Sequence, residues 1–161
     1  MDSVTAGAQP VENIQTTLVA TPHGGYYSVL TSDMKTKHGK CVKMYDSGRV
    51  EYTCEYVNGE VHGRYIKYHD LDMPEACGLD SESPIYQIIE YDKGKKHGGY
   101  VRYTSEGLLV ESQKYVNGLR HVMHYAYAGG KPIYTQYQNG IPTRRIMWSA
   151  NHSSPECSYE L

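Results

Sequence analysis

The residues of this 161-residue chain that could carry out chemistry are chiefly its eight histidines and four cysteines. A metal site or an acid–base reaction would require several such side chains to converge. Four of the histidines instead recur at intervals: 24 residues separate His38 from His62, and His97 from His121, while 35 separate His62 from His97. On successive pairs of strands, spaced about 4.8 Å apart, neighbouring histidines would lie about 10 Å from each other. That is too far to share one ion, so we predict structural roles in turns and no metal site.

The cysteines, at positions 41, 54, 77 and 157, contain no C-x-x-C pair and no spacing typical of a metal site. The sequence also lacks the nucleophile-elbow, zincin, phosphate-loop and dinucleotide motifs. We therefore predict that the protein is not an enzyme and has no cofactor. The first residues show no secretory signal, so the cysteines are expected to be reduced thiols in an intracellular, cytoplasmic protein. No apolar run approaches the roughly 20 residues needed to span a bilayer.

The composition restricts the class of partner. The net charge is −2 and the pI is about 6.4, which excludes a global attraction for nucleic acid. Apolar residues make up only 39% of the chain, with 17 tyrosines and no phenylalanine, so a thick aliphatic core is not expected. Tyrosine suits a half-buried sheet because its ring packs while its hydroxyl stays within reach of water or a partner.

A second dipeptide sets the expected fold. Asn-Gly occurs at 58–59, 117–118 and 139–140, and Lys93 with Gly94 fills the remaining slot. Asn-Gly is the strongest short hairpin signal because both residues accept positive φ. The segments between these turns are five to eight residues long and rich in Tyr, Val and Ile. We predict an all-β fold: an elongated, open, twisted antiparallel sheet of successive β-hairpins.

The alternation of side chains along the strands predicts two different faces. The positions four and six residues after each repeated histidine are apolar or aromatic, and the position between them holds Lys43, Lys67, Arg102 or Ala126. The returning strands carry Tyr56, Tyr91, Tyr115 and Tyr137. One face should therefore hold a ladder of aromatic and branched residues, and the other should be mixed and partly basic. Ile146 and Trp148 are predicted to fall on the basic face.

The domain organisation follows from the same spacing. Residues 1–35 form an N-terminal capping segment with candidate strands at 14–20 and 25–30, and a degenerate repeat beginning near His23. Residues 36–149 form the repeat array, which an acidic insertion at 69–83 interrupts. We interpret this insertion as a surface loop, with a binding loop as the alternative. Residues 150–161 form a C-terminal tail that could cover Trp148.

The unit H-G-x-(4–8)-Y-x-x-x-G-x-(7)-Y-x-N-G-x-x-H-G resembles the MORN repeat, particularly the variant in bacterial antitoxin-like proteins and giant-virus repeat arrays. The resemblance covers residues 36–149. Val122 and Arg144 depart from it by replacing the glycine after the histidine slot, and Thr143 replaces the last histidine. The resemblance implies a rod-like open sheet that associates with proteins or membranes, is often dimeric and is not itself catalytic. It also implies that the protein could belong to a virion.

These observations favour a non-catalytic protein–protein interaction or scaffold module. The alternatives are a peripheral module that binds anionic lipid through basic turns and an antitoxin-like inhibitor of a partner protein. The predicted partner-binding residues are Lys95, Lys96, Arg144, Arg145 and Trp148. Because Trp148 lies in the last unit, we predict homodimerisation through the C-terminal end.

Overall fold

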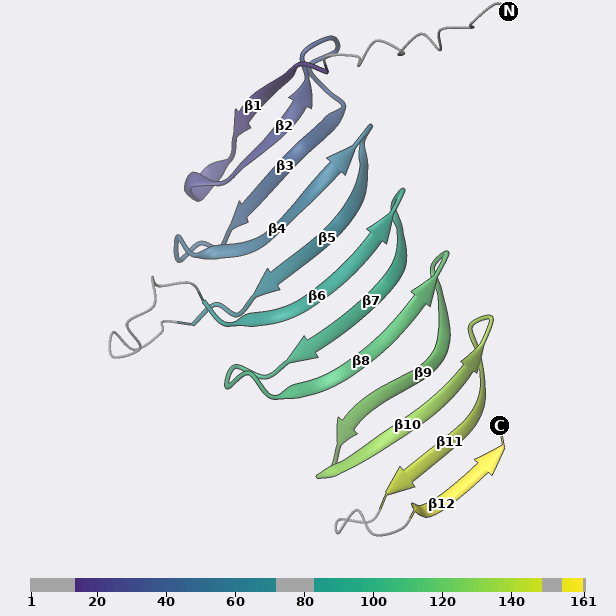
Figure 1. Cartoon of the computed structure of the whole chain (residues 1–161). Coiled ribbons are helices and arrows are strands. Elements are labelled where there is room, and N and C mark those ends of the chain that lie inside the picture. Colours follow the sequence, from purple (N-terminus) through teal and green to yellow (C-terminus); the bar gives the residue numbers. More distant parts are fainter. Residues whose placement is uncertain (1–13, 72–82, 149–154, 161) are drawn as a thin grey trace, which may run out of the picture.

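The computed structural model describes residues 14–71, 83–148 and 155–160, and these form one antiparallel sheet in which the strands follow chain order (Figure 1). The one helical element of this described part is a 3-10 turn, η1 (Pro22–Gly24). The strands are β1 (Thr16–Ala20), β2 (Tyr26–Leu30), β3 (Lys37–Met44), β4 (Val50–Val57), β5 (Glu60–Tyr68), β6 (Ile85–Asp92), β7 (Lys95–Tyr103), β8 (Leu109–Val116), β9 (Leu119–Ala128), β10 (Lys131–Gln138), β11 (Ile141–Trp148) and β12 (Pro155–Glu160). The predicted all-β array of hairpins is confirmed.

The Asn-Gly dipeptides form the turns that were expected of them. Asn58 and Gly59 have φ values of 50° and 85°, the combination of a type I′ turn, and Lys93 and Gly94 repeat it at 46° and 73°. The N–H of Gly59 also donates to the carbonyl of Lys37 at 2.8 Å, one strand beyond its own hairpin. Gly94, Gly118 and Gly140 make the same bond to the preceding unit. Each turn therefore links three consecutive strands.

The repeated histidines lie inside strands, so the prediction that they occupy turns was wrong. Thr53 pairs with Ile66 and Glu55 pairs with His62, which leaves one residue of β4 opposite three residues of β5. The same irregularity, with two extra residues on the His-Gly strand, occurs between β2 and β3, β6 and β7, and β8 and β9. The glycine of the dipeptide adopts the positive φ that this bulge requires, for example 73° at Gly63.

The pairing register defines two faces. The aliphatic face carries a continuous row across the sheet, made of Tyr26, Val42, Thr53, Ile66, Ile88, Val101, Ser112, Tyr125, Tyr134 and Ile146. The opposite face, here called the tyrosine–cation face, carries Tyr27, Tyr52, Tyr56, Tyr65, Tyr91, Tyr100, Tyr115 and Tyr137. Aromatic residues thus occupy both faces. The tyrosines of the returning strands, which were predicted to share the apolar ladder, lie on the basic side: Tyr56, Tyr91, Tyr115 and Tyr137.

The few buried side chains belong mainly to the tyrosine–cation face. Buried apolar residues in the described part are Val29, Cys41, Cys54 and Ile89. In later units, Gln113 and Thr135 occupy the position that corresponds to Cys54 and Ile89, and both are also buried. This face is therefore packed by its own tyrosine rings, whereas the row on the aliphatic face stays partly exposed.

The N-terminal segment adds two strands to the sheet, as predicted, while the C-terminal end differs from expectation. Ile146 pairs with Tyr134 and so lies on the aliphatic face, not on the basic one. The cause is the bulge between β10 and β11, which inserts one extra residue where the other units insert two. A shift of one residue reverses the two faces of a strand.

A backbone hydrogen bond joins the two ends of the insertion, and strand pairing attaches the tail to the sheet. The N–H of His69 donates to the carbonyl of Pro84 at 2.8 Å. Residues 72–82, most of the predicted acidic loop, lie outside the described part. The tail contributes β12, whose Pro155 pairs with Trp148, so it extends the sheet along its edge. The side chain of Trp148 lies outside the described part. None of the described helical segments has the length and apolar character needed to cross a membrane.

Candidate interaction surface on the tyrosine–cation face

In three of the repeats, the residue that precedes the repeated histidine places a cation over tyrosine rings. The ammonium of Lys37 lies 4.9 Å from the ring centroids of both Tyr27 and Tyr56. The ammonium of Lys96 lies 5.4 Å from the centroid of Tyr100 and 5.1 Å from that of Tyr115. Such contacts contribute about 0.5–2 kcal/mol each. They hold a long, flexible cation in one place on the sheet.

The next unit uses arginine in the same slot. The guanidinium of Arg120 lies 5.3 Å from the ring centroid of Tyr137 and donates from Nη1 to its hydroxyl at 2.8 Å. Val61 fills this slot in the unit between Lys37 and Lys96. The carbonyl of each slot residue also accepts the hydrogen bond from the turn glycine described above. The backbone that fixes each turn therefore fixes the cation as well.

Contacts between rings continue the surface between these cations. Tyr52 and Tyr65 have ring centroids 5.0 Å apart, and Tyr65 meets Tyr91 edge-on at 6.3 Å. Tyr100 and Tyr115 repeat the edge-on contact at 6.3 Å. These separations are in the range that favours aromatic pairs.

Burial keeps the phenols of this face neutral. It raises the pKa of Tyr56 and of Tyr100 to about 12, and it also raises the pKa of Tyr65 and Tyr91. At neutral pH these hydroxyls are therefore hydrogen-bonding groups and not phenolate nucleophiles. Burial likewise raises the pKa of the free thiol of Cys54 to about 12, which leaves it unreactive.

The face is positively charged although the whole chain is slightly negative. From β3 to β9 the register places six cations on it, Lys37, Lys43, Lys67, Lys96, Arg102 and Arg120, against two carboxylates. Glu51 accepts from Lys43 at 2.8 Å and contacts Lys67 at 3.4 Å. Glu111 contacts Arg102 at 3.2 Å and His124 at 2.9 Å. These two glutamates do not neutralise Lys37, Lys96 or Arg120, the cations that precede the repeated histidines. Lys43, which lies 5.8 Å from the ring centroid of Tyr52, is paired with Glu51.

The structure does not bring the predicted partner-binding residues together. The register puts Lys96 and Arg145 on the tyrosine–cation face, and Lys95 and Arg144 on the aliphatic face. Lys96 in β7 and Arg145 in β11 are about 19 Å apart, at four strand spacings. Lys37 and Arg120, which the sequence analysis missed, could have been found from their place directly before the repeated histidine.

The repeated histidines hold the turns of the next unit. The N–H of Asn58 donates to His38 Nδ1 at 3.3 Å, and the N–H of Asn117 donates to His97 Nδ1 at 3.4 Å. His62 contacts a carboxylate oxygen of Asp92 at 3.4 Å. Within residues 14–71 and 83–148, no three His, Cys, Asp or Glu side chains are grouped closely enough to hold a metal ion.

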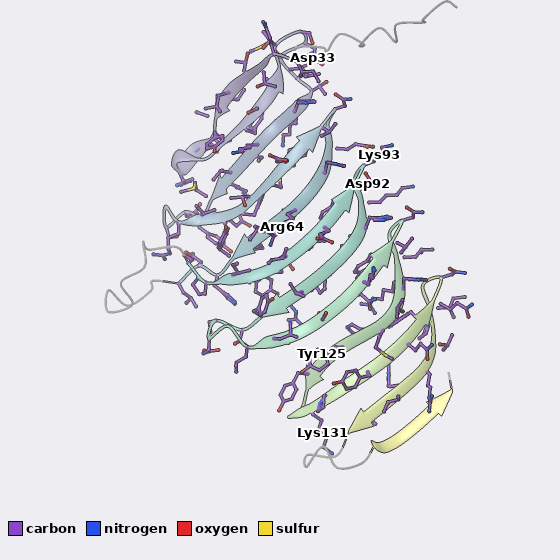
Figure 2. All side chains as sticks on the ribbon, viewed as in Figure 1. Asp33, Arg64, Asp92, Lys93, Tyr125 and Lys131 are labelled. Atoms are coloured by element: carbon purple, nitrogen blue, oxygen red, sulfur yellow. The ribbon has the colours of Figure 1, made fainter. Side chains whose placement is uncertain are left out.

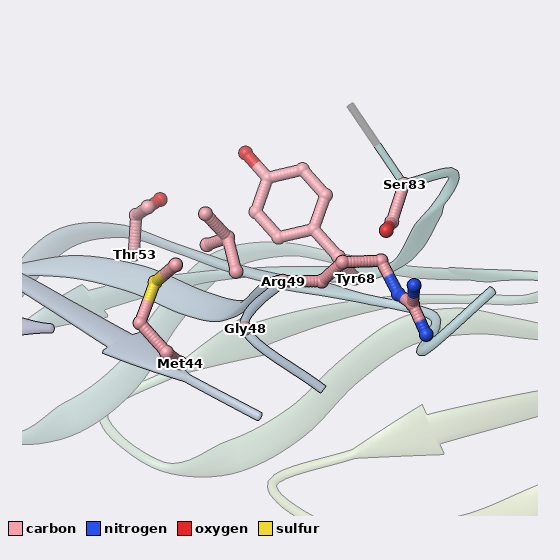
Figure 3. Close-up of a pocket in the computed structure, with 7 residues that line it drawn as sticks. Met44, Gly48, Arg49, Thr53, Tyr68 and Ser83 are labelled. Carbon is pink, nitrogen blue, oxygen red and sulfur yellow. The ribbon is translucent and has the colours of Figure 1, made fainter. Parts of the chain in front are cut away.

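Neither face is covered by a second layer within the described residues. Figure 2 shows side chains standing on both sides of a single ribbon layer. One of the hollows on the aliphatic face, of about 310 Å³, lies near the insertion, where Met44, Thr53 and Tyr68 stand on one side of the sheet (Figure 3). Arg49 at its rim contacts Asp70 at 3.0 Å. The hollow shows no acid–base pair in its lining.

Neither the protein-family models nor the curated proteins compared with this chain match it. The similarity to MORN repeats therefore rests on the spacing of the His-Gly and Asn-Gly motifs.

Proposed function

We propose that this protein is a non-catalytic interaction module of the MORN type, and that its tyrosine–cation face docks on a protein partner. The observation that carries the proposal is the single-layer architecture, which leaves a rigid, tyrosine-rich face without a covering layer among the described residues. A soluble domain usually buries such a face in its own core. Here the array presents it instead.

The composition of the face suits a protein interface. Tyrosine and arginine are enriched among the residues that dominate binding energy, and rings that are already held in place lose little entropy on docking. From β2 to β10 the face extends over about 38 Å, at eight strand spacings. That length accommodates the roughly 800 Å² per partner of a standard interface.

The excess of cations on the face specifies the partner's chemistry. The partner should present apolar patches for the rings and carboxylates for Lys37, Lys96 and Arg120. An antitoxin-like inhibitor is one form of this function, in which the face would mask an acidic surface of an enzyme. A scaffold that joins structural proteins is the other form.

Two charge-reversal variants test the proposal. One carries Lys37→Glu, Lys96→Glu and Arg120→Glu on the tyrosine–cation face. The control carries Lys40→Glu, Arg64→Glu and Lys114→Glu, at three exposed cations of the aliphatic face. Both triple variants have the same net charge, and circular dichroism checks that both fold.

Affinity capture from the native source, quantified by mass spectrometry, is the readout. The first variant should recover at least about tenfold less partner than the wild type, whereas the control should recover as much as the wild type. Equal recovery by both variants would contradict the proposal. A second arm measures sedimentation with vesicles containing phosphatidylserine. Vesicle binding at low salt that both variants lose equally would favour the lipid-binding alternative.

A further inference from the structure

We infer that the outer edge of β1 is a self-complementary docking site, and that a second copy of this chain pairs with it about a twofold axis through Leu18. This interface is distinct from the tyrosine–cation face and does not depend on the function proposed for that face. It also lies at the opposite end of the sheet from the predicted C-terminal contact.

The hydrogen-bonding phase of β1 follows from two bonds at its ends. The N–H of Thr21 donates to the carbonyl of Gly25 at 2.8 Å, and the N–H of Thr31 donates to that of Gln15 at 3.1 Å. Both pairs continue the register of β1 with β2, in which Leu18 lies opposite Ser28. Hydrogen-bonded pairs alternate along an antiparallel ladder. Residues 15, 17, 19 and 21 therefore bond inward to β2.

The remaining residues of the strand, Thr16, Leu18 and Ala20, direct their N–H and C=O groups to the outer edge. Among the described residues, no strand pairs with this edge. Each of the three residues offers one donor and one acceptor, so the edge presents six backbone groups. Such a row is a template for another strand.

A second copy of the same strand fits this template. In an antiparallel pairing centred on Leu18, Thr16 lies opposite the partner's Ala20, and Leu18 lies opposite the partner's Leu18. Every outward group then meets an outward group, so all six on each strand are satisfied at once. A register shifted by one residue would place outward groups opposite inward ones and would satisfy none of them.

The side chains of β1 favour the same occupant. The strand, Thr16–Ala20, contains no charged residue and no proline, and Leu18 is 64% exposed. Natural sheets protect free edges with charges or proline. The strand at the other end, β12, begins with Pro155 and contains two glutamates. The sequence of β12 therefore includes residues that discourage edge pairing, and the sequence of β1 does not. An uncharged edge pairs with its own copy without like-charge repulsion.

The symmetry limits the size of the assembly. A twofold contact uses the β1 edge of each copy, so no β1 edge is left for a third copy and the assembly closes at a dimer. Pairing of β1 with β12 would instead leave one edge of each kind free and produce open filaments. One five-residue strand pair buries less than the 1,200–2,000 Å² of a stable complex. The dimer should therefore form with a dissociation constant on the order of 10–100 µM.

Sedimentation equilibrium of the full chain from about 5 to 500 µM tests the inference, with Leu18→Pro as the first variant. Proline removes the outward N–H of residue 18 and leaves the bonds of β1 to β2 intact, since proline is tolerated at such edge positions. It should weaken the dimer more than tenfold. Leu18→Val is the matched control and should change the affinity less than threefold. A wild type that stays monomeric at 500 µM, or that forms polymers without stopping at a dimer, would overturn the inference.

A charge-pair experiment tests the twofold axis itself. Leu18→Lys and Leu18→Glu should each fail to dimerise, and an equimolar mixture should restore a heterodimer, because only a twofold axis through residue 18 places the two copies of that position opposite each other. Val57→Lys, an exposed apolar position at a distant turn, controls for the added charge. If the mixture fails while each variant still folds, the proposed register is wrong.

Hydrogen exchange gives a readout by residue. With rising protein concentration the amides of Thr16, Leu18 and Ala20 should gain protection, while those of Thr17 and Val19 should change little because they already bond to β2. Protection that rises equally at all five amides would contradict the alternating pattern. The charge-reversal variants of the tyrosine–cation face should leave this dimer unchanged, so failure of either proposal can be recognised separately.

Discussion

The unit that contains His97 and the unit that contains His121 build the same bulge with different residues. In the first, Gly98 has φ 99°, a region that glycine adopts without strain. In the second, Val122 replaces the glycine and yet has φ 65°. A branched side chain is rarely found at positive φ. The surrounding pairing therefore imposes the geometry, and the glycine relieves its strain.

A third unit shows what happens when the motif is lost further. Thr143 and Arg144 occupy the His and Gly positions, and the bulge shrinks from two extra residues to one. The strand then presents its opposite side, which places Ile146 on the aliphatic face. Loss of the motif thus has two outcomes: the geometry is retained with strain, or the register shifts and the faces exchange.

The largest effect is expected from adding a side chain at the regular bulge. In Gly98→Ala, residue 98 would have to keep its positive φ, and the new Cβ would collide with the carboxylate of Glu90. That carboxylate accepts a hydrogen bond from the N–H of Gly99 at 2.5 Å. We expect a loss of about 2–3 kcal/mol in the free energy of unfolding, measured with urea. Gly99→Ala is the neighbouring control, because Gly99 lacks a positive φ, and it should cost less than about 1 kcal/mol. Equal losses in the two variants would show that the bulge does not require glycine.

The strained unit should respond in the opposite direction. Val122→Gly removes a branched residue from φ 65°, and little burial is lost because Val122 is 52% exposed. We expect the free energy of unfolding to rise by about 0.5–1 kcal/mol. The relief of backbone strain is partly offset by the greater conformational entropy of glycine in the unfolded state. Val57→Gly, at another exposed valine, should instead destabilise the protein by a similar amount. A destabilised Val122→Gly variant would show that this valine is not strained.

The contrast between these units also explains what the sequence could predict. The Asn-Gly turns were predictable because their φ requirement is local to two residues, and even Lys93 with Gly94 obeys it. The His-Gly bulges were not, because their geometry depends on the neighbouring strand. The alternation of apolar positions therefore assigned both the aliphatic row and Tyr56, on the returning strand, to one face, although the register separates them.

The candidate surface was only partly predictable for the same reason. Lys96 was selected as part of a basic turn, and the structure places it on tyrosine rings of two different strands. Lys37 and Arg120 do the same in their units, but counting basic residues along the chain did not select them. Their shared role appears only when the strands are placed side by side.

A smaller effect is expected in the turns, where all units share one geometry. Lys93→Asn places the residue that best tolerates positive φ at a position with φ 46°. It should raise the free energy of unfolding by about 0.5 kcal/mol. The reverse change, Asn117→Lys, should lower it by at least that amount, because the side chain of Asn117 also contacts His97 at 3.3 Å. If both changes destabilise the protein equally, the lysine turn has a role beyond its backbone geometry.

The smallest effect on stability is expected from replacing Glu111, a carboxylate beside the strained bulge that contains Val122. Glu111 occupies the position that corresponds to Tyr52, and its contact His124 is one of the three residues of β9 in the bulge. Burial raises the pKa of Glu111, but the hydrogen bond from His124 and the charge of Arg102 outweigh it, so the pKa lies below its ordinary value of 4.5.

The sign of the resulting pH dependence follows from that shift. Because folding lowers the pKa, the ionised carboxylate stabilises the fold fully above pH 4.5, and this contribution is lost as the pH falls through the folded-state pKa. The melting temperature of the wild type should therefore exceed that of Glu111→Gln at pH 7, and the difference should narrow below about pH 4.5. Ser112→Ala, at the next residue of β8, removes no titratable group and should show no such narrowing. A constant difference for Glu111→Gln would mean that its contacts act through shape and not through charge.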